Sequence, residues 1–313
     1  METKERIETI IDFRPITWRD RVLYEQYFPD GETRGCEFSF ANLYLWGRQN
    51  LCECHGHLVL FSHFDRRSVY PYPIGRGDKR AVLDAIIADS RARGISCRLT
   101  GLSPAAKEAV ERLYPDRFCF YSDEASFDYL YDIHALADLP GKKYHAKRNH
   151  IARFEEACPD AVAEPLCEAN RAAAERMVAA WYEERARENP KGDFHLEKEA
   201  IAKAFHRMNE IGMEGLVLRC GDEVIAVTMG NRFGADTVDV NFEKARTDIP
   251  GAYAAINRAF ARYLREKYPE VRILNREEDM GIEGLRRAKR SYAPIGQVEK
   301  YWACLKEEAY DDD

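Results

Sequence analysis

The sequence of 313 residues has no long apolar run, and its start does not show the pattern of a secretion signal. No window approaches the ~20 consecutive apolar residues that cross a bilayer, and the charged start lacks an apolar stretch before a small-residue cleavage site. We therefore expect a cytoplasmic protein without a transmembrane segment. A peripheral position at the membrane surface is the alternative.

Regular cysteine spacing is also missing. The nine cysteines are odd in number, irregularly spaced and without a CxxC pair, which argues against a disulfide framework. Their densest group is Cys52, Cys54, His55 and His57, which are residue types that bind zinc. Neighbouring residues of a strand face opposite sides, and no second ligand pair follows at a zinc-site spacing, so we expect a hairpin here and no metal site.

Several catalytic signatures are absent, and positive charge is in deficit. No GxSxG, HExxH or GxxxxGK[ST] motif occurs, which disfavours the corresponding hydrolases, zinc proteases and phosphate-loop enzymes. Lys and Arg number 47 against 54 Asp and Glu, for a net charge of −7. This balance argues against stable DNA binding but allows a local basic site. Hydrophobic residues at 45% suffice for one or two globular domains.

An internal duplication is present. Two stretches, residues 50–122 and 215–305, each predict a hairpin, a strand, a helix, a strand, a helix and a final strand. Gly77 and Gly251 precede the first helix of each copy, at the same spacing before the strand residues Leu99 and Ile273. This alternation predicts an α/β (α+β) protein in which helices flank a mixed sheet in each copy.

Pro140-Gly141 follows the first copy and interrupts the patterns on both sides. It predicts two domains, residues 1–140 and residues 141–313. The second domain includes a basic linker and a helical span over residues 170–212. The glycine loop of the first copy, residues 75–78, is the poorer ligand loop, so we expect a degenerate first domain and an active second domain.

The order of elements resembles the Gcn5-related N-acetyltransferase (GNAT) fold in tandem. The runs NREEDMGIEGLRRAKRSYAP (275–294), FEKARTDIPGAYAAIN (242–257) and KYHAKRNHIARF (143–154) resemble the C-terminal domain family of phosphatidylglycerol lysyltransferases, which is related to the Fem aminoacyl transferases. The resemblance implies two GNAT-like domains, each with a mostly antiparallel sheet. Full-length lysyltransferases carry a large membrane region ahead of this domain, and that region is not part of this sequence.

The same resemblance implies an acyl- or aminoacyl-transferase. The donor would be acyl-CoA or aminoacyl-tRNA, with no tightly bound cofactor, and the acceptor would be a small molecule or a lipid head group. A rival hypothesis is a non-catalytic binding module that kept the fold and lost the donor chemistry.

Residues 238–244 alternate strictly, so Asp239, Asn241 and Glu243 are expected on one face of a strand. In the resembled fold, the donor carbonyl lies at the end of this strand. The following helix start would bind a pyrophosphate through its unpaired N–H groups, although Asp248 opposes that role and a plain helix start is the alternative. The predicted donor-binding residues here are Asp239, Asn241, Lys244, Arg246, Gly251 and Ala252.

Three acidic residues, Glu277, Glu278 and Asp279, follow the next strand at the carboxyl edge of the sheet. Crowded carboxylates raise one another's pKa, which suits removal of a proton from an acceptor amine. We expect Glu278 or Asp279 to handle this proton. Binding of a donor ammonium group, or stabilisation of the helix near Gly281, are the alternatives.

Two basic stretches complete the predicted site. Arg286 and Arg290 share a helix face that could meet phosphate, and Tyr292 is the expected proton donor to the leaving group. In the linker, Lys147 and Arg148 belong to the densest basic run, which could bind phosphates of tRNA, a lipid head group or a nucleotide. Solvated surface helices are the alternative for both stretches.

Overall fold

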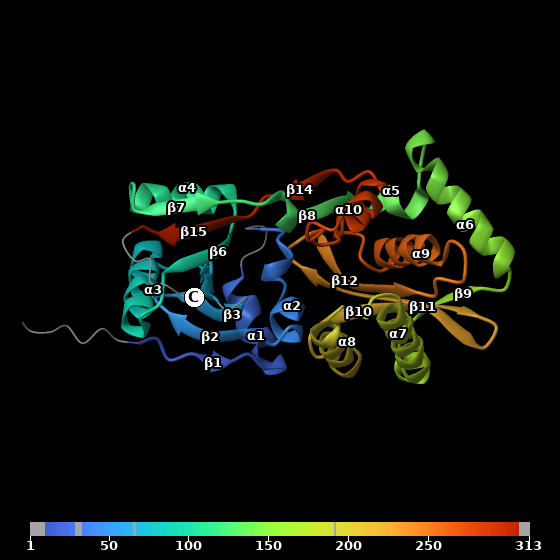
Figure 1. Cartoon of the computed structure of the whole chain (residues 1–313), viewed down its shortest axis with the longest axis horizontal. Coiled ribbons are helices and arrows are strands. Elements are labelled where there is room, and N and C mark those ends of the chain that lie inside the picture. Colours follow the sequence, from blue (N-terminus) through green and yellow to red (C-terminus); the bar gives the residue numbers. More distant parts are fainter. Residues whose placement is uncertain (1–9, 29–32, 65–66, 191, 307–313) are drawn as a thin grey trace, which may run out of the picture. The chain divides into compact units, whose positions relative to one another are not determined.

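A computed structural model of the chain describes residues 10–28, 33–64, 67–190 and 192–306. The first nine residues, which belong to the segment searched for a secretion signal, lie outside this description. The contacts divide the chain into two compact units (Figure 1). One unit comprises Met1–Thr33, Gly47–Glu124 and Glu299–Asp313, and the other comprises Arg34–Trp46 and Ala125–Val298.

The first unit is a sheet in the order β1-β2-β3-β4-β6-β15-β7, with β5 paired to β3. The helix α3 buries Val82, Leu83, Ile86 and Ile87, the apolar stripe that its spacing predicts. Ser103 caps α4 by accepting from the Ala106 amide. The elements are β1 (Arg14–Pro15), a short 3-10 turn (Trp18–Asp20), α1 (Arg21–Tyr27), β2 (Gln49–Cys54), β3 (His57–Phe64), β4 (Arg67–Pro71), β5 (Ile74–Gly75), α3 (Lys79–Arg93), β6 (Arg98–Leu102), α4 (Pro104–Leu113), β7 (Phe118–Tyr121) and β15 (Tyr301–Leu305).

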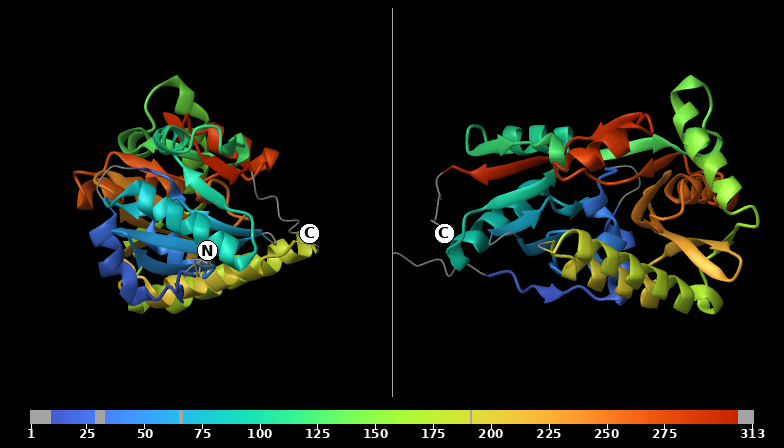
Figure 2. Two further views of the ribbon diagram at one scale, coloured as in Figure 1. Left: turned by 90° about the vertical axis from the view of Figure 1, so that its left-hand side faces the viewer. Right: turned by 45° about the vertical axis from the view of Figure 1, so that its right-hand side comes forward.

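The second unit is a sheet in the order β14-β8-β13-β12-β11-β10-β9. The helices α9 and α5 cover one face, and α7 and α8 cover the other (Figures 1 and 2). The elements are a 3-10 turn (Cys36–Phe38), α2 (Phe40–Leu45), β8 (Asp128–Asp132), α5 (Ile133–Asp138), a 3-10 turn (Lys142–Tyr144), α6 (His145–Ala157), β9 (Val162–Pro165), α7 (Glu168–Glu188), α8 (His195–Arg207), β10 (Met213–Cys220), β11 (Glu223–Phe233), β12 (Thr237–Ala245), α9 (Ala252–Lys267), β13 (Ile273–Asn275), α10 (Glu283–Arg290) and β14 (Gly296–Val298); a further 3-10 turn spans Glu124–Ser126.

The two sheets match strand for strand, which confirms the duplication. The hairpin β2-β3 corresponds to β10-β11, and each hairpin continues into β4 or β12. In the first sheet β6 pairs in parallel with β4, and in the second sheet β13 pairs in parallel with β12. The sixth position is different, because each sheet takes that strand from the chain segment at, or directly after, the end of the other copy. The first sheet takes β15 between β6 and β7, and the second takes β8 between β13 and β14.

This reciprocal exchange explains why the compact units differ from the predicted domains 1–140 and 141–313. The segment Ala125–Val298 begins with β8, which pairs only with strands of the second sheet among the described residues. The segment Arg34–Trp46 contributes α2, which contacts α8. The Pro140-Gly141 pair indicates where the first repeat ends in the sequence. The pairing of the strands, however, determines which hydrophobic core each segment joins.

The central position of β15 gives a test of the exchange. Ala303 is fully buried in the first core, between β6 and β7. We expect Ala303→Asp to lower the free energy of unfolding of the first unit by at least about 3 kcal/mol, because an unpaired carboxylate would be buried. Urea unfolding followed by circular dichroism measures this, with Lys306→Asp at the exposed end of the segment as control. Equal stability of both variants would contradict the central placement of β15.

Candidate functional site

The strands β12 and β13 separate at one point of the second sheet. Their parallel pairing runs from Thr237–Ile273 to Asp239–Asn275 and ends there, while β12 continues to Ala245. Between Met229 and Asn231 the register of β11 against β12 shifts. This bulge breaks the alternation of β12, so that side chains beyond it change faces.

The bulge changes the predicted orientation of three polar side chains of β12. Asp239 and Asn241 both contact Asn42 of α2, whereas Glu243 contacts Asn257 of α9. The three polar residues therefore do not share one face. Strict alternation in sequence could not reveal this, because the extra residue of a bulge has no distinctive composition.

On the α2 side lies an acidic cluster, which we define as Asp128, Asp239, Glu277 and Glu278. The Asn42 amide joins two of its members: Nδ2 donates to Asp239 Oδ2 at 3.1 Å and to Glu277 Oε1 at 2.9 Å. Asn42 Oδ1 accepts from Asn241 Nδ2 at 3.1 Å and from Trp46 Nε1 at 3.1 Å. A neutral side chain thus holds two carboxyl groups close together.

Glu277 has the marks of a reactive carboxyl group. Its φ of 55° lies in the left-handed region, which a non-glycine residue occupies at a cost of about 1–3 kcal/mol. The carbonyl of Glu277 accepts from the Tyr129 amide and from Lys289 Nζ, which holds the strained turn in place. Burial, with the neighbouring Glu278 carboxylate, raises the pKa of Glu277 to about 8. A carboxyl group with this pKa exchanges protons near neutrality.

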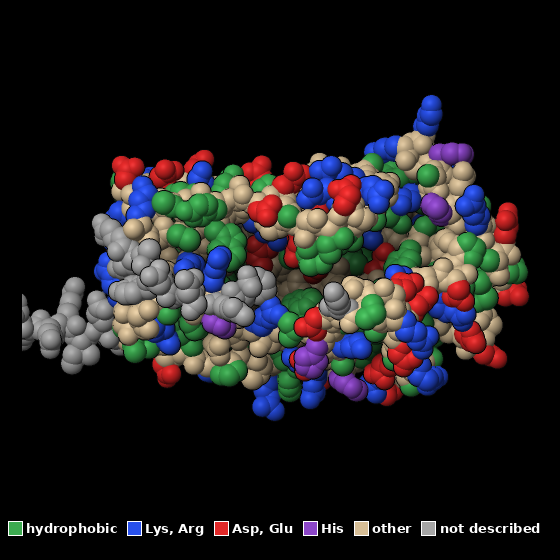
Figure 3. Space-filling model, viewed as in Figure 1, with side chains coloured by type: hydrophobic (Ala, Val, Ile, Leu, Met, Phe, Trp, Pro, Cys, Tyr) green, Lys and Arg blue, Asp and Glu red, His purple; other side chains and the backbone are tan. Residues whose placement is uncertain are grey.

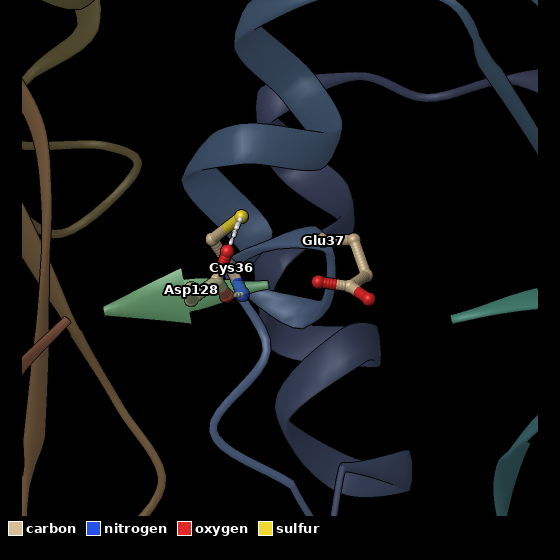
Figure 4. Close-up of side chains that lie close together, drawn as sticks. All are labelled: Cys36, Glu37 and Asp128. Atoms are coloured by element: carbon tan, nitrogen blue, oxygen red, sulfur yellow. Dashed lines mark hydrogen bonds between the residues drawn. The ribbon is translucent and has the colours of Figure 1, made fainter. Parts of the chain in front are cut away.

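The other half of the cluster surrounds Cys36. The Cys36 thiol donates to Asp128 Oδ1 at 3.3 Å and approaches Glu278 Oε2 at 3.6 Å, and Asn275 Nδ2 donates to Asp128 Oδ2 at 2.9 Å. Figure 4 shows Cys36 and Asp128 in contact, with Glu37 extending from the opposite side of the same turn. The ligand atoms of these three residues lie within 4.8 Å of one another, the one such group found in the described residues. The contacts of Asp128 are those of a hydrogen-bonded carboxylate that orders the turn.

On the α9 side lies a second group, the cationic cluster, which we define as Lys147, Arg276 and Tyr292 together with Glu243 and Asn257. Arg276 Nη2 donates to Glu243 Oε1 at 2.9 Å, and Asn257 Nδ2 donates to Glu243 Oε2 at 3.0 Å. Lys147 Nζ lies 3.7 Å from the centroid of the Tyr292 ring, and the Arg276 guanidinium lies 4.9 Å from it. Burial raises the pKa of Tyr292 to about 12, so its phenol stays protonated.

The predicted proton acceptor Asp279 is a structural residue instead. Its carboxylate is fully buried and accepts from Arg286, from the Tyr129 hydroxyl and from the Gly281 amide. The Arg286 guanidinium holds the pKa of Asp279 far below its usual range. Both partners of this ion pair are therefore engaged in ordering the start of α10, and Arg286 is not directed at a donor phosphate. Arg290 is exposed on the same helix.

Three other basic residues, Lys244, Arg246 and Arg148, lie outside both clusters. Lys244 is buried over the Trp181 ring and pairs with Glu197 at 2.7 Å. Arg246 pairs with Asp248 at 2.6 Å and Glu223 at 2.7 Å. Arg148 donates to the carbonyl groups of Leu139 and Gly141, at the end of α5. Sequence charge alone cannot tell a ligand-binding cation from one that is already paired.

The backbone of α6 comes close to Gly251 at the start of α9. Gly251 has a φ of 77°, and a Cβ at this position would lie 1.9 Å from the His150 carbonyl oxygen of α6. Ala252 is 1% exposed. The backbone of α6 thus packs against the helix start that we expected to bind a pyrophosphate. A phosphate site at Gly251 and Ala252 does not fit this packing.

Of the predicted residues, the structure brings together Asp239, Asn241, Glu277 and Glu278 in or beside the acidic cluster, and Lys147 and Tyr292 in the cationic cluster. The sequence analysis missed Asn42, Cys36, Asp128, Asn257 and the clustering of Arg276 with Glu243. One signal was available: Asn42 is a polar residue within the aromatic run EFSFANLYLW, where burial of an amide requires partners.

Comparison with known proteins places the chain in a family. The family described as phosphatidylglycerol lysyltransferase, C-terminal, matches residues 29–304. The chain belongs to this family. The predicted resemblance is thereby confirmed, and the match covers most of the residues that the structure describes.

Solved structures of other proteins share its fold. A conserved protein of unknown function from Bacteroides thetaiotaomicron is 35% identical, with a TM-score of 0.89 over 95% of this chain and 100% of that one. L-PGS from Bacillus licheniformis is 16% identical, with a TM-score of 0.65 over 92% and 93%. FemX is 11% identical, with a TM-score of 0.59 over 94% and 97%. The predicted fold class is confirmed. A comparison of this chain with curated proteins finds no match.

The described ranges contain no helix with the length and apolar character needed to cross a membrane.

The raised pKa of Glu277 predicts a pH-dependent stability. Folding raises this pKa from 4.5 to about 8, so the protonated form is favoured in the native state. The stabilisation is present below pH 4.5 and is lost as the pH rises through about 8. Glu277→Gln cannot ionise but still accepts from Asn42. We expect this variant to be more stable than the wild type at pH 9, by up to about 5 kcal/mol, and equally stable near pH 4.

Urea unfolding at both pH values measures this difference. Glu283→Gln, on the exposed side of α10, is the matched control and is expected to follow the wild type. A constant difference between Glu277→Gln and the wild type across this range would show that Glu277 titrates normally.

Proposed function

We propose that this family member is an aminoacyltransferase that moves an amino acid from the ester bond of a charged tRNA to a hydroxyl or amine acceptor. One observation carries the proposal: a strained, half-buried glutamate with a raised pKa of about 8 lies where the sheet opens between β12 and β13. Family membership supports transferase chemistry at a coarse level. The donor and the acceptor are parts of the proposal.

Glu277 is the general base of this scheme, in place of Glu278 or Asp279. As the acceptor atom forms its bond to the donor carbonyl carbon, its proton passes to the Glu277 carboxylate. The bond to the terminal ribose oxygen then breaks, and this oxygen takes the proton that Glu277 carries, which restores the carboxylate. Asp239 and Asn42 fix the position of Glu277, because both carboxyl groups share the Asn42 amide. Carboxylates near this point also suit an ammonium group on the donor amino acid.

The packing at Gly251 favours an aminoacyl ester over acyl-CoA as the donor. A CoA pyrophosphate needs room beside the helix start, and at Gly251 the backbone of α6 approaches too closely even for a Cβ atom. In the non-catalytic alternative, the acidic cluster binds a ligand but catalyses no reaction. A transfer assay with charged tRNA distinguishes the catalytic hypothesis from the non-catalytic one.

The 3-10 turn Lys142–Tyr144 and the exposed side of α6 form the proposed contact for tRNA phosphates, which we call the α6 surface. Lys142, Lys143 and Arg153 are exposed, together with His145 and His150. Within the described part of the chain, the first three form no ion pair. Figure 3 shows basic and histidine side chains gathered over this helix. Unpaired cations of this kind bind phosphates and release counterions.

A transfer assay tests the role of Glu277. The protein is mixed with tRNA charged with radiolabelled amino acids and with phospholipid vesicles or small amines, and label in the acceptor fraction is counted. We expect Glu277→Gln to lower turnover by at least about 100-fold while tRNA binding stays within twofold, because a general base contributes 10²–10⁴. The wild-type rate should rise with pH to a plateau above about 8. Full activity of Glu277→Gln would refute the assignment.

Salt dependence tests the α6 surface. Charge reversal at Lys143 and Arg153 should weaken binding of tRNA and lower the slope of log affinity against log salt by roughly one per cation removed. Arg187→Glu on α7 is the matched control, since Arg187 is exposed and pairs only loosely with Glu183 at 3.7 Å. Equal slopes for all variants would place the tRNA contact elsewhere.

A further inference from the structure

Two cysteines lie opposite each other on neighbouring strands of the first sheet. Cys119 of β7 and Cys304 of β15 are paired in register, and both are free thiols (Figure 1). Ala303 and Leu305 are buried in the first core, so the Cys304 side chain points to the other face. Phe118 is buried in that core as well and places Cys119 in the same way. The two thiols therefore share the face of the sheet that α3 and α4 do not cover.

The register gives the pair a separation that a disulfide can span. The Lys306 amide donates to the Arg117 carbonyl at 2.9 Å, two positions beyond the pair on each strand. Because hydrogen-bonded and non-hydrogen-bonded pairs alternate, Cys119 and Cys304 form a hydrogen-bonded pair, in which Cα atoms lie about 5.5 Å apart. Disulfides join residues whose Cα atoms are roughly 4.4–6.8 Å apart. At no other paired position of the described strands do two cysteines face each other.

The surroundings of the pair suit reaction with an oxidant. Both side chains are half-buried, whereas Cys36, Cys97 and Cys158 are buried. Arg98 of β6 lies opposite Cys304 on the other side of β15. Burial raises the pKa of Cys304, and the Arg98 guanidinium opposes this rise because it favours the thiolate. Thiols that are accessible and lie beside a cation react, whereas structural buried thiols are inert.

We propose that Cys119 and Cys304 form a redox modification site, at which hydrogen peroxide converts the two thiols into a disulfide. The sulfur of one cysteine attacks the peroxide and becomes a sulfenic acid, with release of one water molecule. The second thiol attacks this sulfur, forms the S–S bond and releases a second water molecule. Two thiols are oxidised and one hydrogen peroxide is reduced to water, so no other co-reactant is needed.

The disulfide fixes the strand exchange covalently, because β7 belongs to the first copy and β15 to the second. Cys119 and Cys304 are separated by more than half of the chain, so the bond closes a long loop and restricts the unfolded chain. We expect the melting temperature to rise by at least about 5 °C on oxidation. The acidic cluster belongs to the other compact unit. The inference therefore does not rest on the aminoacyltransferase proposal, and either can fail alone.

Peptide mapping of the oxidised full chain tests the site. The protein is treated with hydrogen peroxide, the remaining thiols are blocked with iodoacetamide in denaturant, and the digest is analysed by mass spectrometry. We expect a linked pair of peptides that contains Cys119 and Cys304 and separates on reduction with dithiothreitol. The melting temperature of the unblocked protein should rise as the link forms and return to its starting value after reduction.

Serine variants provide the controls. Cys119→Ser and Cys304→Ser should each abolish both the link and the rise in melting temperature, whereas Cys167→Ser, at an exposed thiol, should keep both. Complete alkylation of Cys119 and Cys304 after peroxide treatment would overturn the inference. A link between Cys158 and Cys220, which border the second core, in place of the proposed one would overturn it as well. So would an unchanged melting temperature of the linked protein.

Discussion

The end of the parallel pairing between β12 and β13 is the constraint on which both clusters depend. Beyond Asp239–Asn275 the two strands no longer bond to each other, so polar side chains occupy the space between them. Asp239 and Asn275 are both fully buried at this point. Their burial is tolerable because amide groups from α2 and β13 hydrogen-bond to the carboxylates. The local cost of opening the sheet is offset by these partners.

One short turn after β13 contributes a residue to each of the two clusters, on opposite faces of the sheet. Arg276 enters the cationic cluster, and Glu277 enters the acidic cluster on the other side. The positive φ of Glu277 makes this divergence possible, and Lys289 stabilises it by donating to the carbonyl groups of both residues. Neighbouring residues thereby meet opposite electrostatic surroundings. Carboxyl groups that crowd together hold protons to higher pH, whereas crowded cations favour an anionic ligand.

Local patterns in the sequence predict much of the fold. The periodicity of α3 and α9, the hairpin turns near Gly56 and Gly221 and the Ser103 cap each follow from nearby residues. The exchange of β8 and β15 does not, because pairing between strands that lie far apart in the sequence leaves no local trace. The site shows the same division. The acidic run after β13 is visible in sequence, but the bulge in β12 and the Asn42 contacts arise only from tertiary structure.

The central claim is that Glu277 is protonated at neutral pH because the fold partly removes it from water beside other carboxyl groups. Carbon-13 NMR of protein labelled at the glutamate side-chain carboxyl carbons tests this directly, with the Glu277 signal assigned by its loss in Glu277→Gln. A titration midpoint near pH 8, well separated from the exposed glutamates, is the predicted result. A midpoint near 4.5, the ordinary value for glutamate, would contradict the account.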